Sequence, residues 1–600
     1  MSTYEDRLKA LREELARRRL DGFVVPLTDE HMSEYVGAYA QRLAWLTGFQ
    51  GSAGSAVVLP AEAAIFVDGR YTLQVREQVD GAHWSYQSVP QTSIAQWLRE
   101  HAGADARIGY DPWLHTRGWV AAARAALAAK GAELVAVETN PVDAIWPDQP
   151  RPSDARLLVQ PDALAGKPSS IKRQEIADWL DAHGADVAVL SALDSIAWAL
   201  NIRGADVDRT PVALAYALVH ADATADLFVA PDKLDDEVRQ HLGNAVRIHD
   251  RAAFQPALGQ LSGKCVVADP ERAVAAIFEA LDAAGATIFE ARDPAVLSKA
   301  VKNETEIAGH RAAQARDGAA LTRFLHWLSI EAPKGGLTEL SAAAKLLAFR
   351  EENGLLRDLS FDTISAAGPN AAIPHYRVSA QSDRRIEIDS IYLVDSGGQY
   401  QDGTTDVTRT IIVGTPTAEM KDRFTRVLKG HIALARALFP EGTRGSQLDT
   451  LARQYLWAAG LDYAHGTGHG VGAFLSVHEG PQRIAPVGSG YAGGDEPLRA
   501  GMILSNEPGY YKSGDYGIRI ENLVLVEPRD VAGAEKRVFG FETLTFAPID
   551  RNLIDVTLLD SGERAWVDAY HAKVADLIGP LVPLDVRDWL EGACRPLEGA

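Results

Sequence analysis

Five side chains suited to bind metal ions, spread along the C-terminal half, constrain the fold of this 600-residue chain most strongly. Four are carboxylates at or near the ends of apolar segments, and the fifth is a histidine in a glycine-rich loop. Carboxylates gathered in one pocket raise one another's pKa unless cations lie between them. Two divalent ions carry +4 against the −4 of the acids, so the set predicts a two-metal hydrolase site that generates a hydroxide nucleophile. The five residues are Asp395, Asp406, His469, Glu507 and Glu521.

The sequences around the two aspartates predict neighbouring strands. Asp395 ends the apolar segment 391–395, before a Ser-Gly-Gly turn. In the predicted strand 404–411, side chains alternate between faces, so Asp406 shares a face with Thr404 and Thr408. We expect these two strands to pair in antiparallel fashion through a short connection and to bring their carboxylates together.

Two further predicted strands carry the glutamates. Segment 517–524 has a period of two, which places Arg519 and Glu521 on one face, and segment 502–507 ends at Glu507 before a Pro-Gly break. Around His469, four glycines in 465–472 allow the backbone to approach a site closely. A single acid at a strand end is usually a turn or surface residue in a chain with 81 acids, but the joint pattern favours a metal site.

These segments resemble a known family. The order Asp, Asp, His, Glu, Glu with its flanks is similar to that of the pita-bread metallopeptidases, and more specifically to the three-domain, cytosolic Xaa-Pro aminopeptidases. The likeness extends into the N-terminal segments 45–54 and 68–71. It implies an α/β and α+β fold, with two creatinase-like α/β domains followed by a pita-bread catalytic domain. The segments that carry it are 374–376, 394–397, 465–472, 477–481, 506–511 and 517–522.

The length of the chain predicts several domains, and we expect boundaries that give 1–150, 151–295 and 296–600, the last with a C-terminal extension. The proline-rich segment 141–152 predicts a linker, because proline is excluded from regular helix and sheet interiors. A capped helical stretch is expected to begin after residue 297. The first two domains each pass from an apolar strand to a Trp-bearing segment and another strand, which favours duplication over chance recurrence.

Composition restricts the partners and the compartment. The net charge of −21 argues against binding to nucleic acid or to an anionic membrane, since both would repel the chain. Two cysteines give no disulfide framework, and the charged first residues do not have the pattern of a signal peptide. No uncharged run reaches the roughly 20 residues that cross a bilayer. We therefore expect a cytoplasmic protein.

Three more histidines and an arginine are expected around the metal site. A histidine beside a metal-generated nucleophile is suited to donate to an oxyanion or to move protons, because its ordinary pKa of about 6.5 lies near working pH. The resemblance implies that His375 and His478 face the substrate, with His465 nearby. We expect His478 to stabilise the carbonyl oxygen and His375 to contact the substrate backbone. Arg519 is expected to fix Glu521, with a plain salt bridge as the alternative.

The ligand types favour Mn²⁺, with Zn²⁺ or Co²⁺ as possible replacements, because carboxylates and one imidazole suit hard or borderline cations. We expect Asp395 and Glu521 to bridge or flank the two ions and Asp406 to chelate one of them. His469 and Glu507 would complete the other. Glu507 is also the expected proton carrier between the attacking solvent and the departing nitrogen, in agreement with the resemblance.

The predicted activity, which rests on the resemblance, is release of the N-terminal residue from peptides with proline in the second position. Alternatives are a prolidase restricted to Xaa-Pro dipeptides, a metal-free pita-bread binding protein, and a creatinase-like amidinohydrolase. A homodimer is expected from the family, and the helical pattern of 561–590 is explained by core packing or a subunit contact. The stretch from His478 to Glu507, which contains the segment 486–494, is expected to be long and flexible, and the reach of Arg377 toward substrate is left open.

Overall fold

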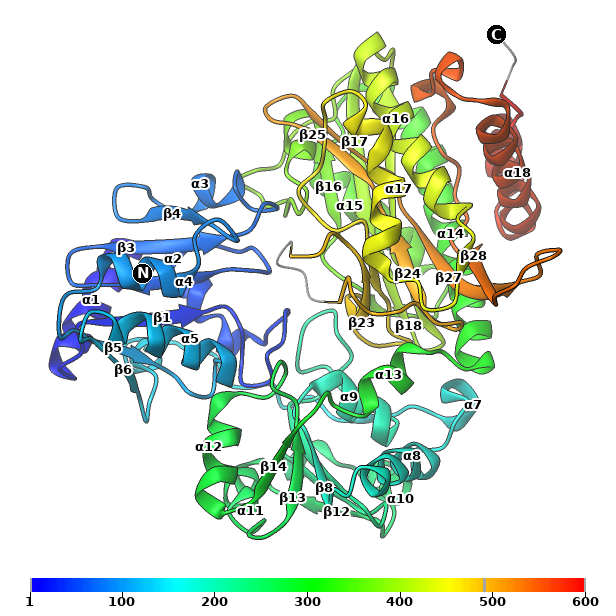
Figure 1. Ribbon diagram of the computed structural model, residues 1–600. Coiled ribbons are helices and arrows are strands. Elements are labelled where there is room, and N and C mark those ends of the chain that lie inside the picture. The colour runs from blue at the N-terminus through cyan, green and yellow to red at the C-terminus, as the bar shows by residue number, and fades with distance from the viewer. Residues whose placement is uncertain (1–2, 489–492, 598–600) are drawn as a thin grey trace. The chain divides into compact units, whose positions relative to one another are not determined.

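The computed structural model describes residues 3–488 and 493–597 (Figure 1). It contains two compact units, Met1–Val296 and Leu297–Ala600, and each is described by itself. Residues 489–492, within the segment that was expected to be flexible, lie outside the described residues.

The N-terminal half of unit 1 is a six-stranded sheet with strand order β4-β3-β2-β1-β5-β6. Strands β1, β2 and β3 pair in antiparallel fashion, whereas β4, β5 and β6 join in parallel. Parallel joins require crossover connections, and helices supply them. The strands are β1 (Gly22–Pro26), β2 (Ser55–Val58), β3 (Ala63–Val67), β4 (Ser85–Ser88), β5 (Arg107–Tyr110) and β6 (Glu133–Ala136).

Alternating side chains bury both faces of this sheet. In β1, Phe23 and Val25 pack on one face, with α1 (Tyr4–Arg17), whereas Val24 packs on the other. The second face is covered by α4 (Ile94–His101) and α5 (Arg117–Ala128). A strand covered on both faces reads as a nearly continuous apolar run, which is the pattern of the inner strands β1 and β3, whereas the edge strands β4 and β6 are partly exposed.

The second half of unit 1 repeats this topology. Its sheet has the order β12-β11-β10-β8-β13-β14, and the sequence of antiparallel and parallel pairs matches that of the first sheet position by position. The predicted duplication is therefore confirmed. The strands are β8 (Val187–Leu190), β10 (Ala215–His220), β11 (Ala225–Val229), β12 (Val246–His249), β13 (Cys265–Ala268) and β14 (Thr287–Glu290).

The prediction that 141–152 lacks regular structure is wrong at its start. Pro141–Ala144 forms the short helix α6, with Asn140 as its N-cap. Proline at the first helical position removes an N–H that would have no partner inside the helix, so it favours a helix start there. The residues after Trp146 form no helix or strand until β7 (Leu158–Val159).

Unit 2 is an α+β structure whose central strands form several small sheets and one of six strands, ordered β21-β28-β27-β24-β22-β23. The single helical stretch expected from residue 298 is wrong at its start, because 298–300 end the short helix α13 (Ala295–Ala300) and the capped helix α14 (Glu304–Glu331) begins only after the N-cap Asn303. Other helices are α15 (Glu339–Glu351), α16 (Ala418–Ala435) and α17 (Gly445–Trp457). The six strands are β21 (Phe439–Pro440), β22 (Gly468–Gly470), β23 (Glu479–Ile484), β24 (Ile503–Asn506), β27 (Asn522–Arg529) and β28 (Val538–Thr543).

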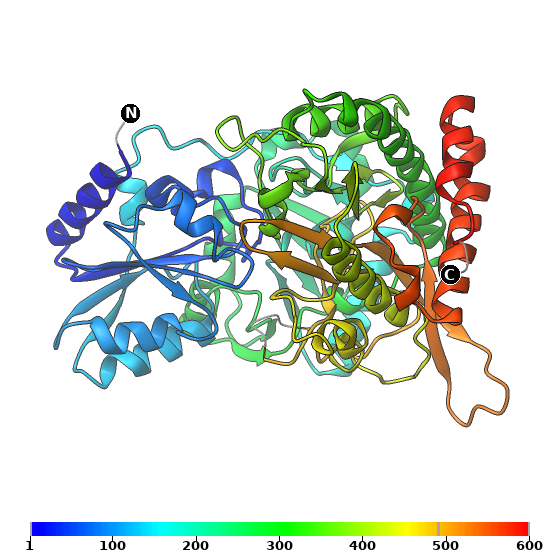
Figure 2. The ribbon, with the colours of Figure 1, turned by 90° about the horizontal axis from the view of Figure 1, so that it is seen from above.

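The C-terminal stretch is helical, as its apolar spacing indicated. It forms α18 (Ser561–Ile578) and α19 (Leu584–Ala593), and α18 lies beside α14 (Figure 2). Val567, Tyr570 and Val574 are buried against the core that contains α16, whereas Leu577 is 42% exposed. Core packing thus accounts for most of the apolar face of α18.

Candidate active site

The two aspartates are brought together by antiparallel strands in unit 2. Asp395 lies in β17 (Ser390–Ser396) opposite Thr408 of β20 (Val407–Val413), and Asp406 directly precedes β20. One strand through 404–411 was predicted, and this is wrong. The chain leaves one sheet after β19 (Gly403–Thr404) and enters another at β20. The Ser-Gly-Gly turn is also absent, because the chain passes from β17 to β18 (Gly398–Tyr400) with a break only at Gly397.

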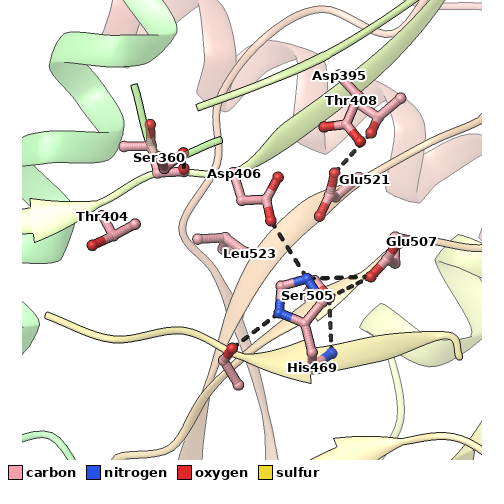
Figure 3. Close-up of polar contacts among 12 residues, drawn as sticks. Ser360, Asp395, Thr404, Asp406, Thr408, His469, Ser505, Glu507, Glu521 and Leu523 are labelled. Carbon is pink, nitrogen blue, oxygen red and sulfur yellow. Dashed lines mark hydrogen bonds and ion pairs between the residues drawn. The ribbon is translucent and has the colours of Figure 1, made fainter. Parts of the chain in front are cut away.

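A similar break positions Glu521. The predicted strand 517–524 is two strands, β26 (Tyr516–Arg519) and β27, separated at Ile520-Glu521 and belonging to different sheets. The backbone N–H of Glu521 donates to the carbonyl of Thr408, and the Thr408 hydroxyl donates to Glu521 Oε2 at 2.7 Å. The break turns Glu521 out of a regular ladder and toward the aspartates, as Figure 3 shows.

Glu507 and His469 approach from the six-stranded sheet. Glu507 follows the last residue of β24, as predicted, and its Oε1 accepts a hydrogen bond from Ser505. His469 is the middle residue of β22, and its Nε2 lies 3.4 Å from both Asp406 Oδ2 and Glu507 Oε1 (Figure 3). The five side chains predicted as metal ligands therefore come from five separate strand ends or strands around one point.

The donor set fits metal ions. His469 Nδ1 lies 2.9 Å from the carbonyl oxygen of Gly470, so Nδ1 carries the proton and Nε2 presents its lone pair to two carboxylates. A lone pair facing carboxylate oxygens at 3.4 Å is repulsive unless a cation lies between them. Ligand atoms of Asp406, His469 and Glu521 all lie within 4.8 Å of one another, and buried Asp395 Oδ1 has no hydrogen-bond partner among the residues that the structure describes.

The electrostatics of the pocket point the same way. Burial, and then the charge of Asp395, raises the pKa of Asp406 well above its ordinary value. Burial followed by the charges of Asp406 and Asp395 does the same for the pKa of Glu521. Burial lowers the pKa of His469 to about 4, so the imidazole is neutral at pH 7. Acids that repel one another around a neutral imidazole form a site that divalent cations would stabilise.

Arg519 is linked to the cluster by hydrogen bonds. It donates to Asp395 Oδ2 at 2.7 Å, to the Thr408 hydroxyl at 3.1 Å and to the Tyr511 hydroxyl at 2.7 Å. Tyr511 in turn lies 2.8 Å from His465 Nε2. Arg519 thus donates directly to Asp395 and is linked to Glu521 through Thr408.

Thr408 and Tyr511 were not predicted as site residues. Thr408 had been placed on the same strand face as Asp406, and Tyr511 lies in the segment 506–511 that carries the family likeness. Their hydroxyls link charged groups that lie far apart in the sequence. A local pattern contains no sign of such links.

The histidines expected to face substrate form a line of rings that ends at the cluster. His478 lies edge-on to His469, with ring centroids 4.3 Å apart, and His375 lies 6.4 Å from His478. His375 and His478 are half-buried, whereas His465 is buried. The side chain of Arg377 is 53% exposed and forms an ion pair with Asp362 at 2.7 Å.

Comparison with known proteins agrees with this architecture. Residues 7–145 and 148–306 each match a creatinase/prolidase N-terminal domain, and residues 308–528 match metallopeptidase family M24. Residues 537–597 match the C-terminal region of the same peptidase family. The fold and the site therefore define a metallopeptidase in which a pita-bread catalytic domain follows two creatinase-like domains along the chain.

Full-length relatives are more specific. A probable Xaa-Pro aminopeptidase P from Laccaria bicolor is 42% identical, over 99% of this chain and 93% of the relative. The crystal structure of an X-prolyl aminopeptidase from Caenorhabditis elegans, described as a cytosolic enzyme with a di-nuclear active site, superimposes with a TM-score of 0.94 at 35% identity, covering 99% of this chain and 100% of that one. The chain belongs to metallopeptidase family M24, in the group represented by these Xaa-Pro aminopeptidases.

A prolidase from Pyrococcus horikoshii is a more distant relative. It is 26% identical, with a TM-score of 0.50, and the match covers 99% of the prolidase but only 63% of this chain.

None of the helices in the described residues is both long and apolar enough to traverse a bilayer.

Proposed function

We propose that this protein is a metal-dependent aminopeptidase that releases the N-terminal residue from peptides with proline in the second position. The observation that supports this most directly is the cluster of Asp406, His469 and Glu521, whose ligand atoms lie within 4.8 Å of one another, in a chain that matches Xaa-Pro aminopeptidases along its whole length. The buried oxygen and nitrogen atoms of these side chains are suited to bind divalent metal ions, and the substrate class is inferred from the family.

In this proposal Asp395, Asp406, His469, Glu507 and Glu521 would together hold two divalent ions. A pair of such ions polarises a carbonyl and lowers the pKa of water, and so provides a nucleophile at neutral pH. Mn²⁺ is the first choice, and Zn²⁺ or Co²⁺ are possible replacements, because the donors are mainly carboxylates.

Side chains of the protein would transfer the proton and orient the substrate. Glu507 Oε1 is hydrogen-bonded by Ser505, and burial raises the pKa of Glu507, so this carboxylate is suited to take up a proton and release it to the leaving nitrogen. His478, edge-on to His469, would donate to the developing oxyanion, and His375, next to His478, would hold the substrate backbone. His465 is joined through Tyr511 to Arg519, which donates to Asp395, and we propose both His465 and Arg519 as substrate-binding residues beside the cluster.

Proline after the scissile bond lacks an amide N–H, so a site for such peptides cannot depend on that donor. The prolidase alternative would use the same cluster for dipeptides only. The Pyrococcus horikoshii prolidase matches 63% of this chain, which leaves a part of it without counterpart there. We therefore favour tripeptides and longer substrates, and a division into domains 1–150, 151–295 and 296–600.

A homodimer and a cytoplasmic location complete the proposal. Two free cysteines, Cys265 and Cys594, agree with a reducing compartment, and the Caenorhabditis elegans relative is described as cytosolic. The acidic net charge of −21 supports peptides rather than nucleic acid or membranes as partners.

A peptide assay tests the proposal. The purified protein with Mn²⁺ is expected to release arginine from a peptide that begins Arg-Pro-Pro and to leave an Xaa-Pro dipeptide largely intact. A chelator, or the substitution Asp406→Ala, should abolish the reaction. Hydrolysis of the dipeptide alone would favour the prolidase, and no hydrolysis with Mn²⁺, Zn²⁺ or Co²⁺ would refute a peptidase.

A further inference from the structure

A buried carboxylate outside the metal cluster organises the loop that carries His375. Glu339, the first residue of α15, is 0% exposed. Its Oε1 accepts hydrogen bonds from the backbone N–H of Ala367 at 2.7 Å and from the Asn370 amide at 2.9 Å. Its Oε2 accepts from the Tyr376 hydroxyl at 2.8 Å and from the backbone N–H of Arg384 at 3.0 Å. One side chain therefore holds four points of the segment 367–384.

These four contacts lie on both sides of His375. Ala367 ends β16 (Ile364–Ala367), Asn370 lies in the short helix Gly368–Ala372, and Tyr376 is the residue next to His375. The Tyr376 hydroxyl also accepts from the Asn370 amide at 2.9 Å and lies 2.8 Å from the Ser382 hydroxyl. The loop is thus tied to Glu339 before, beside and after the histidine.

The donors to Glu339 are neutral, so no cation offsets the free-energy cost of burying its carboxylate. Burying a carboxylate is unfavourable unless it is fully hydrogen-bonded or paired, and most buried acids are paired with a cation. Here two backbone amides, one side-chain amide and one hydroxyl satisfy it, together with the N-terminus of α15, where negative charge is favoured. A loop with no positional requirement would fold as well around an apolar side chain.

We propose that Glu339 is a positioning residue for peptide hydrolysis, which acts by fixing the 367–384 loop so that the His375 ring stands beside His478. The inference rests on the proposed function, because it takes His375 as a residue that contacts the peptide. Misplacement of such a group by about 1 Å can lower a rate by roughly 100-fold. Tyr376 is the link between Glu339 and the histidine.

Tyr376→Phe is the mildest test, because it removes one hydroxyl and keeps the buried ring. We expect kcat/KM on an Xaa-Pro-Xaa tripeptide to fall about 10-fold, and Glu339→Gln to lower it further, while both variants keep the metal content of the wild type. Tyr400→Phe is the matched control. Tyr400 is a buried tyrosine whose hydroxyl also donates to a buried carboxylate, that of Asp317 at 2.8 Å, outside the 367–384 loop, and loss of this hydroxyl should leave kcat/KM unchanged.

A double-mutant cycle separates positioning from general stability. If Glu339 and Tyr376 act through His375, Tyr376→Phe should change kcat/KM less than 2-fold when introduced into His375→Ala. A full 10-fold loss in that background would overturn the proposal, as would an unchanged kcat/KM for Tyr376→Phe or for His375→Ala in the wild-type chain. A metal-loaded wild type without peptidase activity would instead refute the proposed function, and this inference with it.

Discussion

Asp406→Asn should have opposite effects on stability in the metal-free and metal-loaded protein. The substitution keeps the shape of the side chain and removes one negative charge from a buried cluster in which Asp406 is only 3% exposed. Without metal, the carboxylates repel one another, so loss of one charge should stabilise the fold. With metal, the same charge is a ligand, so its loss should weaken the stabilisation that binding provides.

The magnitude follows from the distances. Ligand atoms of Asp406 and Glu521 lie within 4.8 Å, and two unit charges at that distance interact by about 3.5 kcal/mol at an effective dielectric constant of about 20. Protonation relieves part of this, because burial and the neighbouring carboxylates raise the pKa of both acids. We expect a net gain of about 1–2 kcal/mol in chelator, or roughly 2–4 °C in the unfolding midpoint.

The pH dependence has a definite sign. An acid whose pKa is higher in the folded than in the unfolded state makes folding take up protons, so the stability of the metal-free protein falls as pH rises. The advantage of Asp406→Asn in chelator should therefore grow as the pH rises above the ordinary aspartate pKa of 3.8. In a 100-fold excess of metal over its dissociation constant, the wild type should gain about 3 kcal/mol and become the more stable protein.

Thermal unfolding with and without chelator measures all of these effects. Asp402→Asn is the control, because Asp402 is paired with Arg316 at 2.9 Å and its loss should not stabilise the protein in either condition. If Asp406→Asn is less stable than the wild type in chelator at every pH, the acids do not repel one another as the geometry implies, and the electrostatic argument fails.

Three other substitutions test the supports of the site. Arg453→Met breaks a buried ion pair with Asp449 and two hydrogen bonds to the backbone carbonyls of Tyr463 and His465. The free energy of unfolding, measured by urea denaturation, should fall by about 3–5 kcal/mol. A loss below about 1 kcal/mol would contradict this. Lys302→Met leaves the buried Glu479 paired with Lys299 alone, so we expect a comparable loss in the same assay. An unchanged stability would be evidence against the buried ion pairs of Glu479 with the two lysines. Gly468→Ala would place a Cβ 2.0 Å from the carbonyl oxygen of Ser505, so the variant should not accumulate as folded protein, and normal yield with full activity would count against the observed packing.

Much of the site could be predicted because its strands have strong local signals. Asp395 follows an apolar, β-branched run and does lie in β17, and Glu507 follows β24 directly. The breaks before Asp406 and before Glu521 were missed. Period-two alternation and β-branched content continue through both breaks, and neither signal shows when a chain exchanges one hydrogen-bonding partner for another.

Contacts between distant segments were the other limit. The hydrogen bonds to the Glu339 carboxylate come from four residues that lie 28 or more positions away along the chain. In the sequence, Glu339 has the ordinary pattern of an acid in the first turn of a helix, where negative charge is favoured in any case. Only the fold shows that its carboxylate also holds a loop of the active site.

Anomalous diffraction from crystals grown with manganese tests the central claim most directly. The account predicts two peaks roughly 3.5–4 Å apart, both enclosed by Asp395, Asp406, His469, Glu507 and Glu521. A pocket without anomalous signal at saturating manganese, or manganese bound only elsewhere on the chain, would contradict it.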